Sequence, residues 1–358
     1  MTQFFLRRLL LLLPVLAGIL FTTFAIARLI PGDPCYVALG ERATEEQCNA
    51  YRERLGLNDN IGVQFTRYLG NVVRGDFGVS LKTSRPVSDV IVERLPMTLE
   101  LTIGAMLFST TFGILLGIIS AVRRNSVLDV VTMIGANIGV SMPVFWLGLM
   151  LAYLFALTLK GTPLWIPPSG RLTSGLSIPP LTETFQLDGL AGFPLAAVTF
   201  ASNMYTLNAL LTGNVKVWTD AAWHLILPSV AVGTIPLSII ARMTRSSLLE
   251  VLNQDYIRTA RAKGLMQRTV IFRHALRNAM LPIVTIVGLQ VGGLLSGAVL
   301  TETIFGLPGI GTWLITSILA RDYSVVQAAT VVIAIIYVMV NMLVDASYAF
   351  LDPRIRLQ

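Results

Sequence analysis

The sequence predicts an all-α integral membrane protein with six transmembrane helices and both termini in the cytoplasm. Of its 358 residues, 54% are hydrophobic and only 13% are charged, whereas soluble domains carry about 25% charged residues. Six apolar stretches are long enough to cross a hydrocarbon layer about 30 Å thick. Lys and Arg residues gather in the loops expected on one side, which is the positive-inside pattern. The net charge of +7 therefore reports membrane orientation and gives no argument for nucleic-acid binding.

The first span is expected over about Leu9 to Ile30, directly after Arg7 and Arg8. The apolar core of a signal peptide has about 7–15 residues, so this longer stretch predicts an uncleaved span with its N-terminus inside. Residues 31–97 then form a small extracytoplasmic domain. Within it, Thr44 and Gln47 have the spacing of a capping box, which predicts a helix ending near Gly56.

Cys35 and Cys48 both lie in this extracytoplasmic domain. On the oxidising side of the membrane they could form a disulfide. Two unpaired thiols remain the alternative, because the sequence does not give the distance between the two Cα atoms.

The second span is expected over about Leu101 to Val122, and the third over about Val130 to Thr158 with an interruption at Pro143. The stretch 187–211 is apolar as well. An additional crossing there would place the basic segment that follows the fourth span outside, so we expect an interfacial helix instead.

The remaining spans are expected over about Trp218 to Ile240, Ala279 to Leu300 and Ala328 to Phe350. In the fifth, Gly288, Gly292, Gly293 and Gly297 form two Gly-x-x-x-Gly pairs, which favour close helix packing within the chain or at a subunit interface. The predicted segments are 1–30 (N-terminus and first span), 31–97 (extracytoplasmic domain), 98–160 (spans two and three), 161–217 (second extracytoplasmic segment), 218–246 (span four), 247–278 (cytoplasmic loop) and 279–358 (spans five and six with a short tail).

The loop 247–278 belongs to the most basic part of the chain. From Arg242 to Arg277 there are eight Lys or Arg residues against two acidic ones. The pattern predicts an amphipathic helix over Ser247 to Lys263, a stop at Gly264, and a second helical stretch over Gln267 to Met280. Two short helices around a glycine fit a rigid knob for a soluble partner, and a basic loop lying on anionic lipid is the alternative.

Several chemistries find no support in the sequence. It contains no Gly-x-x-x-x-Gly-Lys-Ser/Thr loop for ATP, and neither a Gly-x-Ser-x-Gly nor a His-Glu-x-x-His motif. The spans carry almost no charge near their centres, which disfavours an ion-coupled carrier. The sequence therefore predicts no catalytic residue, no metal site and no cofactor in this chain, so that any transport is powered by other subunits.

The basic loop resembles a motif of the permease subunits of ATP-binding-cassette importers. Ala260, Gly264 and Leu276 keep the general motif, while 256–265 and 273–279 read like its version in the dipeptide/oligopeptide/nickel family. The resemblance is nearest to the dipeptide permease B-type subunit. It extends over nearly the whole chain, through residues 31–34, 75–80, 98–100, 243–247, 302–311, 345 and 353–356.

This resemblance implies a type I importer permease fold in a prokaryotic inner membrane. It also implies four kinds of partner or ligand: a second homologous permease subunit, two cytoplasmic ATPases that hold ATP and Mg²⁺, membrane lipid, and a binding protein that delivers di- or oligopeptides. A nickel or other small-solute importer of the same family is the alternative, and an ion-coupled secondary carrier is a weaker one.

The resemblance also suggests site residues. The predicted ATPase-coupling residues are Arg258, Thr259, Ala260, Arg261, Ala262, Lys263, Gly264 and Leu265. The predicted docking residues for the binding protein are Asp33, Glu302, Phe305 and Pro308. The translocation path is expected among the second to fifth spans, without individual residues assigned.

Overall fold

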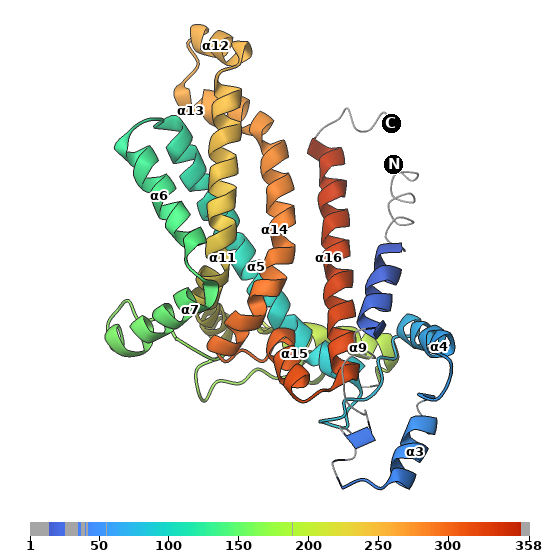
Figure 1. The fold of residues 1–358 in the computed structure, drawn as a ribbon. Helices are drawn as coiled ribbons and strands as arrows, with labels where there is room; N and C mark the ends of the chain where they lie inside the picture. Colours follow the sequence, from blue (N-terminus) through green and yellow to red (C-terminus); the bar gives the residue numbers. More distant parts are fainter. Residues whose placement is uncertain are drawn as a thin grey trace. The chain divides into compact units, whose positions relative to one another are not determined.

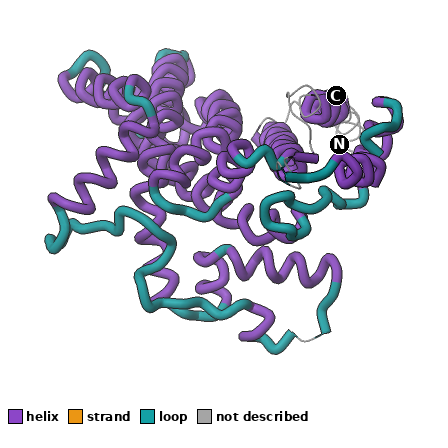
Figure 2. Tube along the Cα trace, turned by 60° about the horizontal axis from the view of Figure 1, so that its bottom comes forward, coloured by secondary structure: helices purple, strands orange, loops and turns teal. Residues whose placement is uncertain are grey.

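The computed structural model describes residues 14–25, 35–36, 40, 42–54, 56–187 and 189–351. In this part of the chain the regular elements are helices, and a single bridge joins Val79 to Pro86 (Figures 1 and 2). The chain divides into two compact units. Unit 1 comprises residues 1–97, 179–204 and 308–338, and unit 2 comprises residues 98–178, 205–307 and 339–358.

Unit 1 contains the helix Pro14–Ala25, α3 (Glu45–Arg54), α4 (Ile61–Val73), α8 (Leu181–Thr184), α9 (Gly192–Asn203) and α15 (Ile310–Leu319). It also holds the first part of α5 (Val87–Val122) and of α16 (Tyr323–Leu351). The predicted capping box is present at the start of α3. The backbone N–H of Gln47 donates to Thr44 Oγ1 over 3.3 Å, and that of Thr44 donates to Gln47 Oε1 over 3.0 Å.

A disulfide joins Cys35 to Cys48 in unit 1, with the two Cα atoms 5.3 Å apart. Both cysteines are fully buried. A bridge of this kind stabilises a small domain mainly by restricting the unfolded chain. The described residues contain no free cysteine.

Unit 2 contains most of the long apolar helices. Its helical elements are the remainder of α5, then α6 (Val127–Ser141), α7 (Val144–Tyr153), η1 (Leu154–Thr158), α10 (Tyr205–Leu211), α11 (Val215–Leu252), α12 (Asp255–Ala262), α13 (Gln267–Thr269), η2 (Val270–Leu276), α14 (Arg277–Ile304) and the last part of α16. α11 packs against α14, α6, α7 and α10 and is thus the central helix of this unit.

Four helical stretches in the described residues are long and apolar enough to cross a membrane: Val87–Val122, Val215–Leu252, Gln267–Leu295 and Tyr323–Val344. They contain most of the second, fourth, fifth and sixth predicted spans and extend beyond them by several residues. The predicted first span is represented by the shorter helix Pro14–Ala25.

The predicted third span is broken, as Pro143 suggested. α6 and the helical stretch Val144–Thr158 meet at an angle of 102°. Met142, directly before the proline, has the extended conformation that a following proline favours (φ −87°, ψ 126°). The interruption predicted at Pro143 is thus confirmed, and the two halves together form at most one broken crossing.

The apolar stretch 187–211 forms two short helices, α9 and α10, separated at Met204. With 12 and 7 residues, neither reaches the roughly 20 residues that a transmembrane helix needs. The proline-rich part 159–180 before them contains turns and no helix.

Glycines set the distance between α5 and α11 in unit 2. A Cβ atom added at Gly117 would lie 2.5 Å from Thr244 Cβ and 2.7 Å from the carbonyl oxygen of Ala241. Gly113 and Gly233 make similar close approaches to the backbone of the facing helix. Of the fifth-span glycines, Gly288 lies against Val344 and Gly297 against Val232, so these two serve packing inside the chain.

Replacing Gly117 by Val is expected to destabilise the protein by more than the 1–3 kcal/mol typical of overpacking, because backbone rather than a flexible side chain blocks the new atoms. Gly135→Val on α6 is the matched control, since a Cβ there meets nothing within 4 Å. Thermal unfolding of the detergent-purified protein measures the stability of both variants. Equal melting temperatures for the two variants would show that the α5–α11 contact is looser than described.

Candidate functional site

The most distinctive surface of unit 2 is the basic knob, which we define as residues 253–276 with α12 at its tip (Figure 1). The single helix predicted over Ser247 to Lys263 is wrong. α11 continues to Leu252, and the chain turns at Asn253 and the extended Gln254 before α12 begins at Asp255. The predicted second stretch is present, but it runs without a break from α13 through η2 into α14.

Gly264 ends α12 in the way that the sequence predicts. Its φ of +75° lies in the left-handed region, which glycine adopts without strain. The N–H of Gly264 donates to the carbonyl of Arg261, and the N–H of Leu265 donates to that of Ala260. This pair of bonds is a Schellman motif, which closes the helix and reverses the chain over two residues.

One face of the knob is anchored in an apolar core. Ile257 is fully buried and Ala260 is 7% exposed. They pack in a cluster with residues of α5, α11, η2 and α14: Ile118, Ala121, Leu248, Val270, Ile271, Ala275, Ala279 and Ile283. In addition, Asn278 Nδ2 donates to Tyr256 Oη over 2.7 Å. The knob is therefore fixed to the long helices and can move with them as one body.

The opposite face of the knob is exposed in the part of the chain that the structure describes. All predicted coupling residues are exposed except Ala260. The prediction that Ala260 contacts the partner is therefore corrected. Its side chain packs inward and supports the knob. The exposed basic side chains are those of Arg258, Arg261 and Lys263. Two apolar side chains follow them in the chain and are also exposed, Leu265 to 40% and Met266 to 75%. An apolar tip surrounded by positive charge suits a protein cleft with acidic edges.

The predicted docking residues do not form a common exposed surface. Glu302 and Phe305 have 0% exposure. Thr98 Oγ1 donates to Glu302 Oε1 over 2.6 Å, and the Phe305 ring lies within contact distance of Gly148. Direct docking through these two side chains is therefore wrong for this structure. Pro308 is exposed, and Asp33 lies outside the described residues.

A buried ionic clamp, which the sequence did not predict, lies near the other end of unit 2. Glu100 Oε2 accepts from Arg171 Nη2 over 2.6 Å. Glu100 Oε1 accepts from the N–H and the hydroxyl of Thr206, over 2.7 and 2.6 Å. The Arg171 guanidinium also lies 3.5 Å from the ring centre of Tyr205. The clamp thus fastens the proline-rich loop and α10 to α5.

Two further contacts hold the same loop. Thr173 donates twice to the carboxylate of Asp220, through its N–H over 2.7 Å and its hydroxyl over 2.6 Å. The N–H of Gly170 donates to the carbonyl of Phe305 over 2.9 Å. A segment without regular structure is therefore held by charge-assisted bonds at several points, which gives it a defined conformation.

A second ion pair joins α6 to α11 near the knob. Arg245 Nε and Nη2 donate to the two oxygens of Asp129 over 2.8 and 2.9 Å. Asp129 also accepts from the Asn125 N–H over 2.9 Å and from the Ser120 hydroxyl. This bidentate pair fixes the first turn of α6 to α11. The sequence motif that contains Arg245 did not indicate that Asp129 would be its partner.

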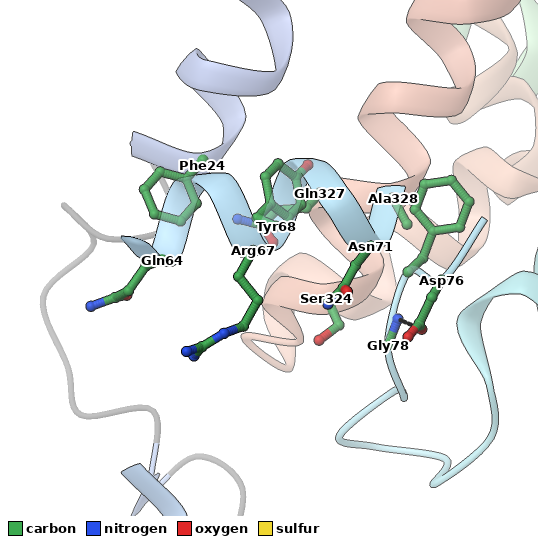
Figure 3. A pocket seen from close by; sticks show the side chains of 11 residues that line it. Phe24, Gln64, Arg67, Tyr68, Asn71, Asp76, Gly78, Ser324, Gln327 and Ala328 are labelled. Atoms are coloured by element: carbon green, nitrogen blue, oxygen red, sulfur yellow. Dashed lines mark hydrogen bonds between the residues drawn. The ribbon is translucent and has the colours of Figure 1, made fainter. Parts of the chain in front are cut away.

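Unit 1 contains a small polar pocket of about 170 Å³. Figure 3 shows side chains from the helix Pro14–Ala25, from α4 and from the start of α16 around it. Arg67 is paired with Asp59 over 2.7 Å. Burial raises the pKa of Tyr68, so its hydroxyl stays protonated and neutral. With its one arginine already paired, the pocket gives no basis for assigning a ligand.

The comparisons with known proteins agree with the motifs. Residues 113–357 match the family model described as "Binding-protein-dependent transport system inner membrane component", and residues 1–102 match the N-terminal model of the same kind of protein. The di/tripeptide transport system permease protein DppB of Pseudomonas aeruginosa is 47% identical over the full length of both chains.

Other relatives are equally well covered. The dipeptide transport system permease protein DppB of Escherichia coli strain K12 is 44% identical over 99% of each chain. The probable D,D-dipeptide transport system permease protein DdpB of the same strain is 43% identical over 95% of this chain and 94% of the relative. These matches show that the chain belongs to the inner-membrane permease components of binding-protein-dependent transport systems.

Proposed function

We propose that this chain is the permease subunit of an ATP-driven importer that carries di- or oligopeptides across the inner membrane. The observation that carries the proposal is the basic knob, which is anchored in the core of the long helices on one face and exposed on the other. Full-length relatives named as dipeptide or di/tripeptide permeases supply the cargo class.

The knob is suited to transmit force. A short helix closed by a Schellman motif and seated on an apolar core transfers rigid-body motion, whereas a flexible loop would absorb it. In this proposal ATPase subunits bind the exposed side chains of α12, so ATP and Mg²⁺ are needed only in those partners. This role also favours a protein partner over a lipid surface, because a lipid-bound loop would have no need for the rigid seat.

The complete topology follows from the same proposal. The helix Pro14–Ala25 belongs to the first span, the bent pair α6 and α7 forms the third, and four long helices supply the others. The knob and both termini then lie in the cytoplasm, as the distribution of Lys and Arg favours. A second, homologous permease chain completes the path, and a binding protein docks on the extracytoplasmic segments, with Pro308 as an exposed contact.

Reconstitution tests this function. The chain is assembled with its genomic neighbours (the second permease and two ATPases) in vesicles containing ATP, and the binding protein loaded with labelled dipeptide is added outside. We expect ATP-dependent accumulation of dipeptide that stops when this chain is omitted. Accumulation of nickel and not of dipeptide would contradict the proposed cargo, and transport by this chain without ATPases would contradict the proposed mechanism.

A further inference from the structure

A groove of about 800 Å³ runs between α6 and α11 in unit 2. It is lined by Asn125, Asp129, Val130, Met133, Ile134 and Asn137 on one side and by Ile239, Arg242, Met243, Arg245 and Ser246 on the other. Ligand sites usually measure about 300–1,000 Å³, so the groove is large enough for a short peptide.

One polar side chain of this groove, that of Asn137, lies well along α6 from the start of the helix. Asp129, Met133 and Asn137 follow one another at single-turn spacing along α6. At 1.5 Å per residue, Asn137 lies about 15 Å along the helix from Val127, which is halfway across a hydrocarbon layer of about 30 Å.

The Asn137 side chain is exposed and has no hydrogen-bond partner among the described residues. Leaving a side-chain amide without a hydrogen-bond partner in hydrocarbon is strongly unfavourable. Other faces of α6 are plainly apolar, as Val131 and Ile138 show. The part of the groove around Asn137 is therefore suited to water or a polar solute, and the face with Val131 and Ile138 to lipid.

The end of the groove near the knob carries an uncompensated positive charge. Arg245 is neutralised by Asp129. Arg242 is exposed and makes no ion pair in the part of the chain that the structure describes. A guanidinium at the end of a peptide-sized groove complements a carboxylate.

We propose that the α6–α11 groove is this chain's part of the peptide path. The Asn137 amide, which is both donor and acceptor, bonds to the peptide backbone halfway through. Arg242 attracts the terminal carboxylate at the cytoplasmic end. The inference rests on the proposed function and names the residues that contact the cargo. Because both contacts use groups common to all peptides, the path accepts varied side chains.

Cysteine accessibility tests the groove directly. The chain has two cysteines, and both are in the disulfide, so a single introduced cysteine is the reporter. Asn137→Cys and Met133→Cys probe the groove. Val131→Cys and Ile138→Cys are matched controls on the same helix, with native side chains 59% and 53% exposed but outside the groove. The assembled importer in inside-out vesicles is treated with a charged, water-soluble thiol reagent.

We expect the two groove positions to react and the two controls to stay unmodified. We also expect excess dipeptide, and not the same concentration of a disaccharide, to slow modification at the groove positions. Equal reaction at all four positions, or none at the groove, would overturn the proposal, since lipid or a helix of another subunit would then fill the groove. Reaction that dipeptide does not slow would overturn the peptide contact.

Uptake by variants supplies a second readout. Arg242→Gln is expected to lower the maximal rate of dipeptide uptake several-fold. Arg124→Gln, an exposed arginine at the same end of unit 2 but outside the groove, is expected to leave it unchanged. Equal rates for both variants would contradict the role of Arg242. If the unaltered complex imports no peptide, the proposed function itself fails, whereas normal import without protection of the groove positions refutes this inference alone.

Discussion

Gly264→Asp is expected to leave the protein folded and inserted but to reduce peptide uptake by about tenfold or more, the effect of losing about 1.4 kcal/mol of contact free energy. The new carboxylate would lie at the tip of α12 beside Arg261 and Lys263, on the face that we assign to the ATPase. A Cβ atom at Gly264 would meet nothing within 4 Å. We therefore expect the substitution to disturb contacts with the ATPase and not the packing within this chain.

Asparagine at the same position separates charge from backbone conformation. Asn and Asp both tolerate the left-handed region better than other non-glycine residues, and they have nearly the same shape. Gly264→Asn is therefore expected to retain most uptake, whereas Gly264→Val should distort the end of α12 because β-branched residues fit a positive φ poorly.

A further control is available in the proline-rich loop. Gly161 has a φ of +81° and equally open surroundings, so Gly161→Asp makes the same chemical change away from the knob. The measurement is dipeptide uptake and ATP hydrolysis by the reconstituted complex, with surface expression as the check on folding. Normal uptake by Gly264→Asp, or an equal loss in Gly161→Asp, would contradict the coupling role.

Local features were predictable from the sequence because neighbouring residues determine them. The capping box needs only Thr44 and Gln47, and the end of α12 needs only a glycine after a helical pattern. The interruption at Pro143 follows from a missing donor and a steric restriction on Met142. The bend of 102°, however, depends on what α6 and α7 pack against, so its position was predictable from Pro143 and its angle was not.

Long-range features were not predictable in the same way. Glu302 was expected to be a docking contact because residues 302–311 resemble a family motif on the extracytoplasmic side. Its burial follows from contacts such as the one with Thr98, 204 residues earlier in the chain. Likewise, the pairs Asp129–Arg245 and Glu100–Arg171 join residues 116 and 71 positions apart. A single sequence contains no signal that matches such partners.

Removing one partner of the buried clamp is expected to have the largest effect on stability. The side chains of Glu100 and Arg171 are only 3% and 11% exposed. Arg171→Ala leaves the carboxylate of Glu100 buried without its cation. Breaking a buried pair in this way typically costs about 3–5 kcal/mol, and the part of the proline-rich loop around Arg171 should lose its contact with α5 as a result.

The pair Arg85–Glu93 in unit 1 is the matched control. Its side chains are 49% and 41% exposed, and the two residues lie 2.5 Å apart at their nearest atoms. Solvent screens exposed pairs strongly, so Arg85→Ala should barely change the melting temperature even though it removes a similarly short ion pair. A similar decrease in melting temperature for Arg171→Ala and Arg85→Ala would mean that water reaches the Glu100 clamp.

The double variant Glu100→Leu/Arg171→Met separates the need for charge from the need for packing. Replacing both partners of a buried pair with apolar side chains is often neutral or stabilising. We therefore expect it to recover most of the stability that Arg171→Ala loses. If dipeptide uptake recovers as well, the clamp is structural. If the protein is stable but transports slowly, the ionic contact must break and re-form as the loop moves during each transport cycle, and proteolysis of the loop with and without ATP would then detect that movement.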